Sequence, residues 1–301
     1  MLDEFRTYLQ KHEYAKTTID GYCIIAGKFE NWCNTKGYDV ENINYNKWSE
    51  YQNLIKNQIT TNGVQRKDNT IEHIIGVIRL FFDYLVHDDF MILNPIKEIY
   101  YKSNSEFHHQ ALTEDELHEL YYCFPTLNLQ IPMCESAAIR NKVIVGLVVF
   151  QGIESAVFKN LTLDCIDLSK NKIYVPGTKR SNGRTLDLKQ TQISVLRQYI
   201  EHDRAILQKK INCYTEALFP LNSTRYSSMF NDICKKLKTI NLKVTNFRQI
   251  RFSVISIWVK KYDLRKVQIM AGHRFISSTE KYLKIDLDSL QQATQMYHPM
   301  Q

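Results

Sequence analysis

Apolar side chains recur at helical spacing in the first part of the chain. Between positions 16 and 37 they fall every three or four residues, at Ile19, Tyr22, Cys23, Ala26, Phe29, Trp32 and Cys33. This spacing predicts one helix with one buried face. We expect Thr17 or Thr18 to cap its N-terminus and Gly37 to end it.

The same pattern predicts a second helix over about residues 70–87, and weaker patterns predict helices over about 2–10 and 44–58. Asn94-Pro95 follows the second helix, and a residue that precedes proline is restricted to extended backbone. We therefore expect residues 1–98 to form a small domain built only of helices.

A polar stretch without periodicity separates this domain from the rest of the chain. Residues 99–111 contain the segment YYKSNSEFHHQ, which has the character of an interdomain linker. Thr113 and Glu116 then stand three residues apart, the spacing of a capping box at a helix start. The second domain is expected over residues 112–301.

The pattern of the second domain changes twice. Residues 136–151 are almost continuously apolar, which predicts a helix buried on all sides. The short runs IDL, KIYV and RTLDL follow, separated by the turn residues Ser169-Lys170-Asn171 and Asn182-Gly183, and predict a three-stranded antiparallel sheet. Helices are then expected over about 190–210, 224–239, 246–261, 263–271 and 277–284. The fold class is therefore mainly α, with a mixed α/β second domain.

Charge is unevenly distributed along the 301 residues. Lysine and arginine exceed aspartate and glutamate by 39 to 32 overall, but residues 1–98 hold 11 basic and 14 acidic side chains. Residues 170–284 hold 24 basic and only 7 acidic side chains. Such an excess favours a polyanionic partner, with nucleic acid ahead of an acidic membrane surface.

Other features exclude several classes of protein. The longest apolar run, residues 143–150, has eight residues, whereas a helix that spans a bilayer needs about 20. The seven cysteines form no Cys-x-x-Cys pair or zinc-spaced cluster, and no phosphate-binding glycine loop or hydrolase motif occurs. We expect a cytoplasmic protein with reduced thiols, no cofactor and no membrane partner.

The basic half carries one ordered set of chemically active residues. Arg248 and Arg251 lie three apart and share a face near a helix N-terminus, where an anion is favoured. Gly272-His273 follows the next helix, and Tyr282 comes nine residues after the histidine. This order resembles the tyrosine recombinase (phage integrase) family.

Weaker features in the same order extend the resemblance over nearly the whole chain: the Thr18–Tyr22 pattern, the Ile78–Tyr84 run, Asn94-Pro95 and the LTEDEL opening. The resemblance implies a helical core-binding domain and an integrase-type catalytic domain that close around double-stranded DNA. It implies a site-specific recombinase that integrates, excises or inverts a DNA element through a 3′-phosphotyrosine intermediate, without metal or ATP.

Roles follow from the resemblance residue by residue. Tyr282 aligns with the nucleophile and Lys179, in the hairpin GTKRSNGR, with the general acid. Arg251 and His273 align with groups that hold the scissile phosphate, and Arg248 stands where the family has its first motif histidine. Further DNA contacts are expected, against the alternatives of a solvated surface or a cross-strand pair, at Arg180, Arg184, Lys243 and Arg274.

One position departs from the family pattern. The family has an arginine after the Gly-hydrophobic pair that follows the buried helix, but here Gly152-Ile153 precedes Glu154. A carboxylate repels a phosphate, and Arg248 restores the lost positive charge. The departure keeps two alternatives open: a DNA-binding relic that regulates or supports an active recombinase, and a type IB topoisomerase-like enzyme that nicks and reseals.

The family pattern also implies partners. Four protomers would act together on two duplexes, with accessory DNA-bending proteins and a location at the nucleoid. A tail from about residue 286 has helical spacing and is expected to pack on a neighbouring protomer or on its own domain. Should Tyr282 not be the nucleophile, Tyr297 is the next candidate.

Overall fold

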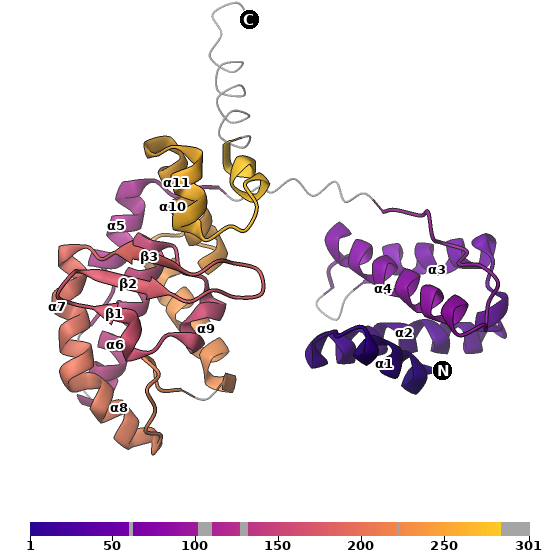
Figure 1. Cartoon of the computed structure of the whole chain (residues 1–301), viewed down its shortest axis with the longest axis horizontal. Coiled ribbons are helices and arrows are strands. Elements are labelled where there is room, and N and C mark those ends of the chain that lie inside the picture. Colours follow the sequence, from indigo (N-terminus) through magenta and orange to yellow (C-terminus); the bar gives the residue numbers. More distant parts are fainter. Residues whose placement is uncertain (60–62, 102–109, 127–131, 222, 284–301) are drawn as a thin grey trace, which may run out of the picture. The chain divides into compact units, whose positions relative to one another are not determined.

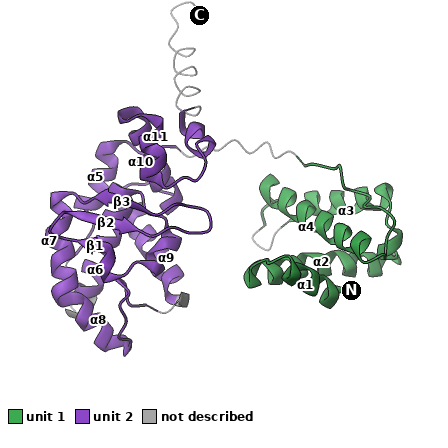
Figure 2. Cartoon of the chain, in the orientation of Figure 1, with its two compact units in different colours: residues 1–107 green, residues 108–301 purple. Residues whose placement is uncertain are grey.

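The computed structural model describes residues 1–59, 63–101, 110–126, 132–221 and 223–283 (Figure 1). The chain divides into two compact units, residues 1–107 and 108–301 (Figure 2). No helix within the described ranges is long and apolar enough to cross a membrane. The expected linker at 99–111 lies mostly outside the described residues, and the expected tail from residue 286 lies wholly outside them, so both stay predictions.

The described part of the N-terminal unit is helical, as predicted. Gly37 ends the second helix in the left-handed conformation, with φ of 69°. The expected cap at Thr17 or Thr18 is wrong, because the helix begins at Lys16 and the carbonyl of Ala15 already accepts from the amides of residues 18 and 19. The α-helices are α1 (Leu2–Lys11), α2 (Lys16–Lys36), α3 (Tyr45–Asn57) and α4 (Asp68–His87).

Aromatic side chains hold these helices together. The ring of Phe29 on α2 lies 4.8 Å from Tyr51 and 6.2 Å from Trp48, both on α3, and 5.5 Å from Phe82 on α4, measured between centroids. All four side chains are buried. Each such ring removes a large apolar area from water, so this cluster joins three helices into one core.

The C-terminal unit is built around one buried helix. The apolar segment predicted over 136–151 forms α6 (Pro132–Gln151), which packs against four other helices of the unit. The predicted capping box is present at Thr113 and Glu116. The remaining α-helices are α5 (Glu114–Tyr122), α7 (Gln190–Gln198), α8 (Arg204–Ile211), α9 (Ser223–Ile240), α10 (Phe247–Lys261) and α11 (Leu264–Ala271), followed by helical residues 277–283; short 3-10 helices cover Ser155–Asn160 and Leu163–Cys165.

The predicted antiparallel sheet is confirmed, in the order β1-β2-β3. Its strands are β1 (Ile166–Asp167), β2 (Lys172–Val175) and β3 (Arg184–Asp187). Val175 pairs with Arg184 at the end of the β2–β3 ladder, so residues 176–183 form the connecting loop. The sheet thus extends a loop from two strands that each bury one face, and this loop reaches the candidate site.

One predicted helix is interrupted. The segment expected as a single helix over 190–210 contains a π-helical turn, Tyr199–Asp203, between α7 and α8. The hydroxyl of Tyr199 donates to the carbonyl of Leu218 at 2.9 Å, and the Arg204 guanidinium donates to the carbonyl of Ala217. A π turn shifts the helical phase by one residue, and here it lets both side chains reach the same following segment.

Candidate active site

The guanidinium of Arg251 joins the ends of two helices. This α10 side chain is only 7% exposed. Its Nη1 donates to the carbonyl of Gly152, just after α6, and its Nη2 donates to the carbonyl of Ala271, the last residue of α11, at 2.7 Å. The last carbonyls of a helix lack partners within the helix and carry the negative end of its dipole. These two bonds therefore fix the orientation of Arg251.

Glu154 supplies a counter-ion to this arginine. Its Oε1 lies 3.3 Å from Nε of Arg251, and its side chain is 45% exposed. Burial lowers the pKa of Arg251, while the charge of Glu154 acts in the opposite direction. An anion that approaches Arg251 from solvent must compete with this carboxylate.

Gly272 and Thr279 place the imidazole of His273. Gly272 has φ of 72° and ends α11, so the chain turns sharply before the histidine. The Nδ1 of His273 lies 2.9 Å from Oγ1 of the fully buried Thr279. Burial, together with the charges of Arg251 and Arg184, lowers the pKa of His273 to about 4. The ring is therefore neutral at pH 7.

Tyr282 lies between two rings. Its ring centroid is 5.9 Å from that of His273 and 5.3 Å from that of Phe252, at interplanar angles of 22° and 27°. Burial raises the pKa of Tyr282, the charges of Arg251 and Arg248 oppose this rise, and Glu154 adds to it. The phenol thus lies within electrostatic reach of residues from three separate segments.

The β2–β3 loop is docked beside His273. The amide of Asn182 donates to the carbonyl of Gly272 at 2.9 Å, and Ser181 forms a β-bridge with His273. The guanidinium of Arg274 donates to the carbonyl of Thr178 at 3.2 Å. These contacts hold the loop whose tip carries Lys179 and Arg180, both exposed.

Arg184 lies inside the unit rather than on its surface. It is 4% exposed, and burial together with the charge of Arg251 lowers its pKa to about 10. A Cβ atom on Gly272 would lie 2.6 Å from its Nη1, so only glycine fits beside this guanidinium. The sequence suggested a DNA contact or a cross-strand partner, and neither description anticipates a buried side chain.

The other two predicted cations have different surroundings. Arg248 is exposed near the start of α10, and an open hollow of about 470 Å³ lies between α9 and this end of α10, with Arg248 in its lining. The Nζ of Lys243 lies 2.6 Å from Oε1 of Glu116, so this lysine already has a partner on the surface of the unit. Of the predicted site residues, the structure therefore groups Arg248, Arg251, His273 and Tyr282 with Arg184 and Glu154, while Lys243 pairs elsewhere.

Two residues of this pocket were not singled out from the sequence. Thr279 holds the imidazole, and Phe252 stacks on the phenol. Phe252 directly follows Arg251, and Thr279 precedes Tyr282 by three residues, about one helical turn. Neither spacing by itself indicates a contact with the site.

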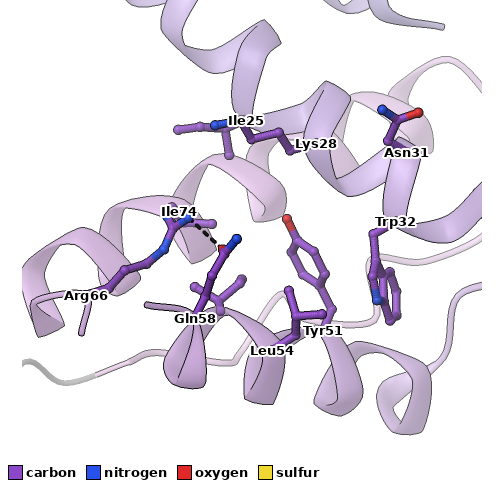
Figure 3. A pocket seen from close by; sticks show the side chains of 10 residues that line it. Ile25, Lys28, Asn31, Trp32, Tyr51, Leu54, Gln58, Arg66 and Ile74 are labelled. Atoms are coloured by element: carbon purple, nitrogen blue, oxygen red, sulfur yellow. Dashed lines mark hydrogen bonds between the residues drawn. The ribbon is translucent and has the colours of Figure 1, made fainter. Parts of the chain in front are cut away.

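A separate hollow of about 370 Å³ lies in the N-terminal unit (Figure 3). Aromatic and aliphatic side chains form its wall, and Gln58 accepts a hydrogen bond from Arg66 at its edge, at 2.7 Å. Its lining residues are Ile25, Lys28, Asn31, Trp32, Tyr51, Leu54, Ile55, Gln58, Arg66 and Ile74. None of these residues belongs to the ordered set of active residues found in the sequence.

Solved structures of similar fold are recombination proteins. The XerH site-specific recombinase, bound to its palindromic difH substrate, aligns with a TM-score of 0.67 over 93% of this chain and 80% of that chain, at 17% identity. The Tn1549 transposon integrase, in complex with transposon right end DNA, aligns with a TM-score of 0.66 over 93% of each chain, at 12% identity. The fold is therefore of the integrase type.

Sequence relatives point to the same class. Tyrosine recombinase XerC of Bacillus pumilus is 25% identical over 305 residues, which cover 98% of this chain and 95% of that protein. XerC of Staphylococcus epidermidis is 24% identical over 311 residues, covering 99% and 97%. Residues 110–288, more than half of the chain, match the phage integrase family. The chain belongs to this family of tyrosine recombinases.

Proposed function

We propose that this protein is a site-specific recombinase that cuts and rejoins double-stranded DNA through a 3′-phosphotyrosyl intermediate formed on Tyr282. The observation that carries the proposal is the grouping of this phenol with a neutral imidazole and a buried guanidinium from separate segments. Family membership and the excess of basic side chains over residues 170–284 support DNA as the substrate.

In the proposed reaction, the Oη atom of Tyr282 attacks the phosphorus of the scissile phosphodiester. The phenolic O–H bond breaks and its proton passes to solvent, because the raised pKa of Tyr282 keeps the phenol protonated at neutral pH. A bond forms between Oη and phosphorus, the bond to the 5′ oxygen breaks, and that oxygen takes a proton from Lys179. The number of phosphoester bonds is unchanged, so the step reverses without ATP or a metal.

The buried polar groups stabilise the charge that develops on the phosphate. Arg251 is already fixed by two carbonyl acceptors, and its planar guanidinium suits nonbridging oxygens. When the hydroxyl of Thr279 donates to Nδ1, the neutral His273 keeps its proton on Nε2 and can donate it to the phosphate. Fixed donors of this kind need no reorganisation as the reaction proceeds.

Lys179 suits the role of general acid because of the loop that carries it. The loop is held by a backbone hydrogen bond to Gly272 and by the guanidinium of Arg274, which donates to the carbonyl of Thr178, while the lysine itself is exposed at the tip. A lysine in this position can reach the 5′ oxygen of a bound duplex and deliver a proton to it. Arg180 and Arg274 then flank the phosphate backbone.

The assembly follows from the proposed reaction. Exchange of strands between two duplexes requires four active sites, so we propose a tetramer on DNA, assisted by DNA-bending proteins at the nucleoid. Phosphate contacts from the basic C-terminal unit should dominate the affinity and make it strongly dependent on salt.

A covalent-capture experiment tests the proposal. A pool of nicked duplexes with randomised flanking sequence traps the intermediate, because the short product diffuses away after cleavage. Wild-type protein and the control Tyr214→Phe, at a strongly exposed tyrosine, should yield an adduct that survives detergent. Tyr282→Phe should yield none and bind DNA within about twofold of wild type, since only one hydroxyl is removed.

Other outcomes identify other functions. An adduct without strand exchange indicates a nicking and resealing enzyme, and DNA binding without an adduct indicates an architectural or regulatory protein. An adduct that persists in Tyr282→Phe would show that another tyrosine is the nucleophile. Tyr297, which lies outside the described residues, is the first to examine.

A further inference from the structure

Arg184 is a buried cation whose hydrogen-bonding capacity is not used. Its Nε and Nη2 atoms are inaccessible to solvent and donate to no acceptor among the described residues. Buried donors without acceptors are costly, and buried guanidinium groups are usually satisfied. The C-terminal unit offers a comparison in Arg204, another buried arginine, which donates to the carbonyls of Thr215 and Ala217.

The surroundings of Arg184 are those of the candidate active site. Its charge and that of Arg251 both lower the pKa of His273, and each arginine feels the charge of Glu154. Its Nη1 lies over Gly272, the residue that precedes the imidazole. The unpartnered donors therefore lie beside the groups that would hold the scissile phosphate.

The charges of the pocket leave Arg184 unmatched. Arg251 is paired with Glu154, and His273 is neutral, so the buried part of the pocket retains one positive charge without a counter-ion. A phosphodiester carries one negative charge and has nonbridging oxygens that accept from planar guanidinium groups. Binding it would neutralise this charge, and a turn of the guanidinium toward the pocket would bring the now enclosed Nε and Nη2 donors to its oxygens.

We propose that Arg184 is a second phosphate-binding guanidinium of the active site. From β3 it supplies the positive charge that the family's arginine supplies after α6, where this chain has Glu154. The inference rests on the proposed function for the identity of the anion, a DNA phosphodiester. It assigns to a strand residue a task that the family pattern gives to the position of Glu154. Arg184 thereby becomes a catalytic residue in the sense that it touches the reacting phosphate.

Replacement by an apolar side chain of similar length separates this role from a structural one. Arg184→Met removes a buried charge that has no partner, so the melting temperature should stay the same or rise. Cleavage of the trapped nicked substrate should nevertheless slow by about 10²- to 10³-fold, the usual effect of losing a donor to the transition state. Arg184→Lys keeps the charge without the planar fork and should recover part of the rate. Thr185→Ala, at the exposed neighbour on β3, is the matched control and should cleave as wild type does.

A neutral substrate provides a second measurement. A methylphosphonate at the scissile position lacks the negative charge that Arg184 would bind. The difference in rate between wild type and Arg184→Met should therefore shrink on this substrate to less than a tenth of its size on the phosphate. A residue that acts only through the fold would slow both substrates equally, and that result overturns the proposal.

A binding measurement keeps this inference separable from the proposed function. Inorganic phosphate, added at constant ionic strength, should raise the melting temperature of wild type and Thr185→Ala but not of Arg184→Met. If wild type forms no adduct yet shows this dependence, the proposed function fails and the anion site stands. If wild type forms the adduct and Arg184→Met cleaves within threefold of it, or melts well below it, the assignment of Arg184 is wrong while the function stands.

Discussion

Glu154 and Arg251 form an ion pair across the candidate site, with 3.3 Å between Oε1 and Nε. The arginine is held rigidly by two carbonyls, whereas the carboxylate stands at the solvent edge. A carboxylate at position 154 therefore has two effects. It replaces the arginine of the family pattern, and it also pairs with the guanidinium of Arg251. DNA must displace it before the Nε–H group of Arg251 can bind a phosphate oxygen.

Removal of this carboxylate should increase cleavage. Glu154→Gln leaves Arg251 unpaired and open to phosphate, and a half-exposed ion pair is worth up to about 1 kcal/mol, or about fivefold in rate. Adduct formation on the nicked substrate measures the effect, with Asp164→Asn, an exposed carboxylate of the same unit, as the control. Glu154→Arg should likewise match or exceed wild type. A collapse of activity in both variants with the fold intact would show that the carboxylate has a role of its own.

Substitution of Lys179 should affect only the departure of the 5′ oxygen. Lys179→Ala should slow cleavage by about 10²- to 10⁴-fold, the range for loss of a general acid. A substrate with sulfur in place of the bridging 5′ oxygen releases a thiolate, which needs no proton, and should restore most of the rate. Single-turnover rates on both substrates are the measurement, and Lys170→Ala, at the β1–β2 turn, is the control. Equal slowing on both substrates would assign the proton to another group.

Gly272 should be intolerant of any side chain. Gly272→Ala places a methyl group at φ of 72°, 2.6 Å from Nη1 of Arg184 and 2.9 Å from the carbonyl oxygen of Asn182. Gly37→Ala in the N-terminal unit has nearly the same φ, 69°, but no atom within 4 Å, so it measures the backbone cost alone, about 1 kcal/mol. We expect Gly272→Ala to lose about 1–2 kcal/mol more than that control. Calorimetry gives both values, and equal losses would mean that both Arg184 and the backbone at Asn182 move aside freely.

Acid should destabilise the C-terminal unit through His273. Its pKa is about 4 in the folded protein against 6.5 ordinarily, so between these values the unfolded chain binds a proton that the folded chain does not. The free energy of unfolding therefore falls as the pH drops from about 7 to 4, by about 1–2 kcal/mol after allowance for solvent screening. His273→Gln should remove this part of the pH dependence, and His202→Gln, at an exposed histidine, should retain it. Melting temperatures at pH 7 and pH 5 distinguish the two.

Periodicity was sufficient to predict the elements of the fold but not their local exceptions. The spacing of Ile19 through Cys33 defined α2, and alternation in KIYV defined β2. The start of α2 was missed because Ala15 has no side-chain acceptor to mark it. The π turn at Tyr199–Asp203 was missed because the hydrogen bonds of Tyr199 and Arg204 that accompany it involve residues beyond the helix.

The site was partly visible in the sequence. Arg251, His273 and Tyr282 were identified from their order and spacing along the chain, which can be read from one sequence without a structure. The alternating pattern of β3 could have predicted the burial of Arg184. Side chains two residues apart in extended backbone point to the same side, and the next two on the side of Arg184 are the buried Leu186 and Leu188. The pairing of Glu154 with Arg251 had none, because it depends on how the end of α6 meets α10.

Arg251 has both a structural and a chemical role, because the guanidinium that is proposed to bind the phosphate also donates to two backbone carbonyls. A descendant of this protein that no longer cleaved DNA but still bound it could lose the hydroxyl of Tyr282 while the ring kept its stacking on Phe252 and His273. Loss of the guanidinium of Arg251 would cost more stability, because the chain after α6 and the end of α11 would lose the donor that they share. Among descendants that no longer cleave DNA, the arginine should therefore be conserved more often than the tyrosine.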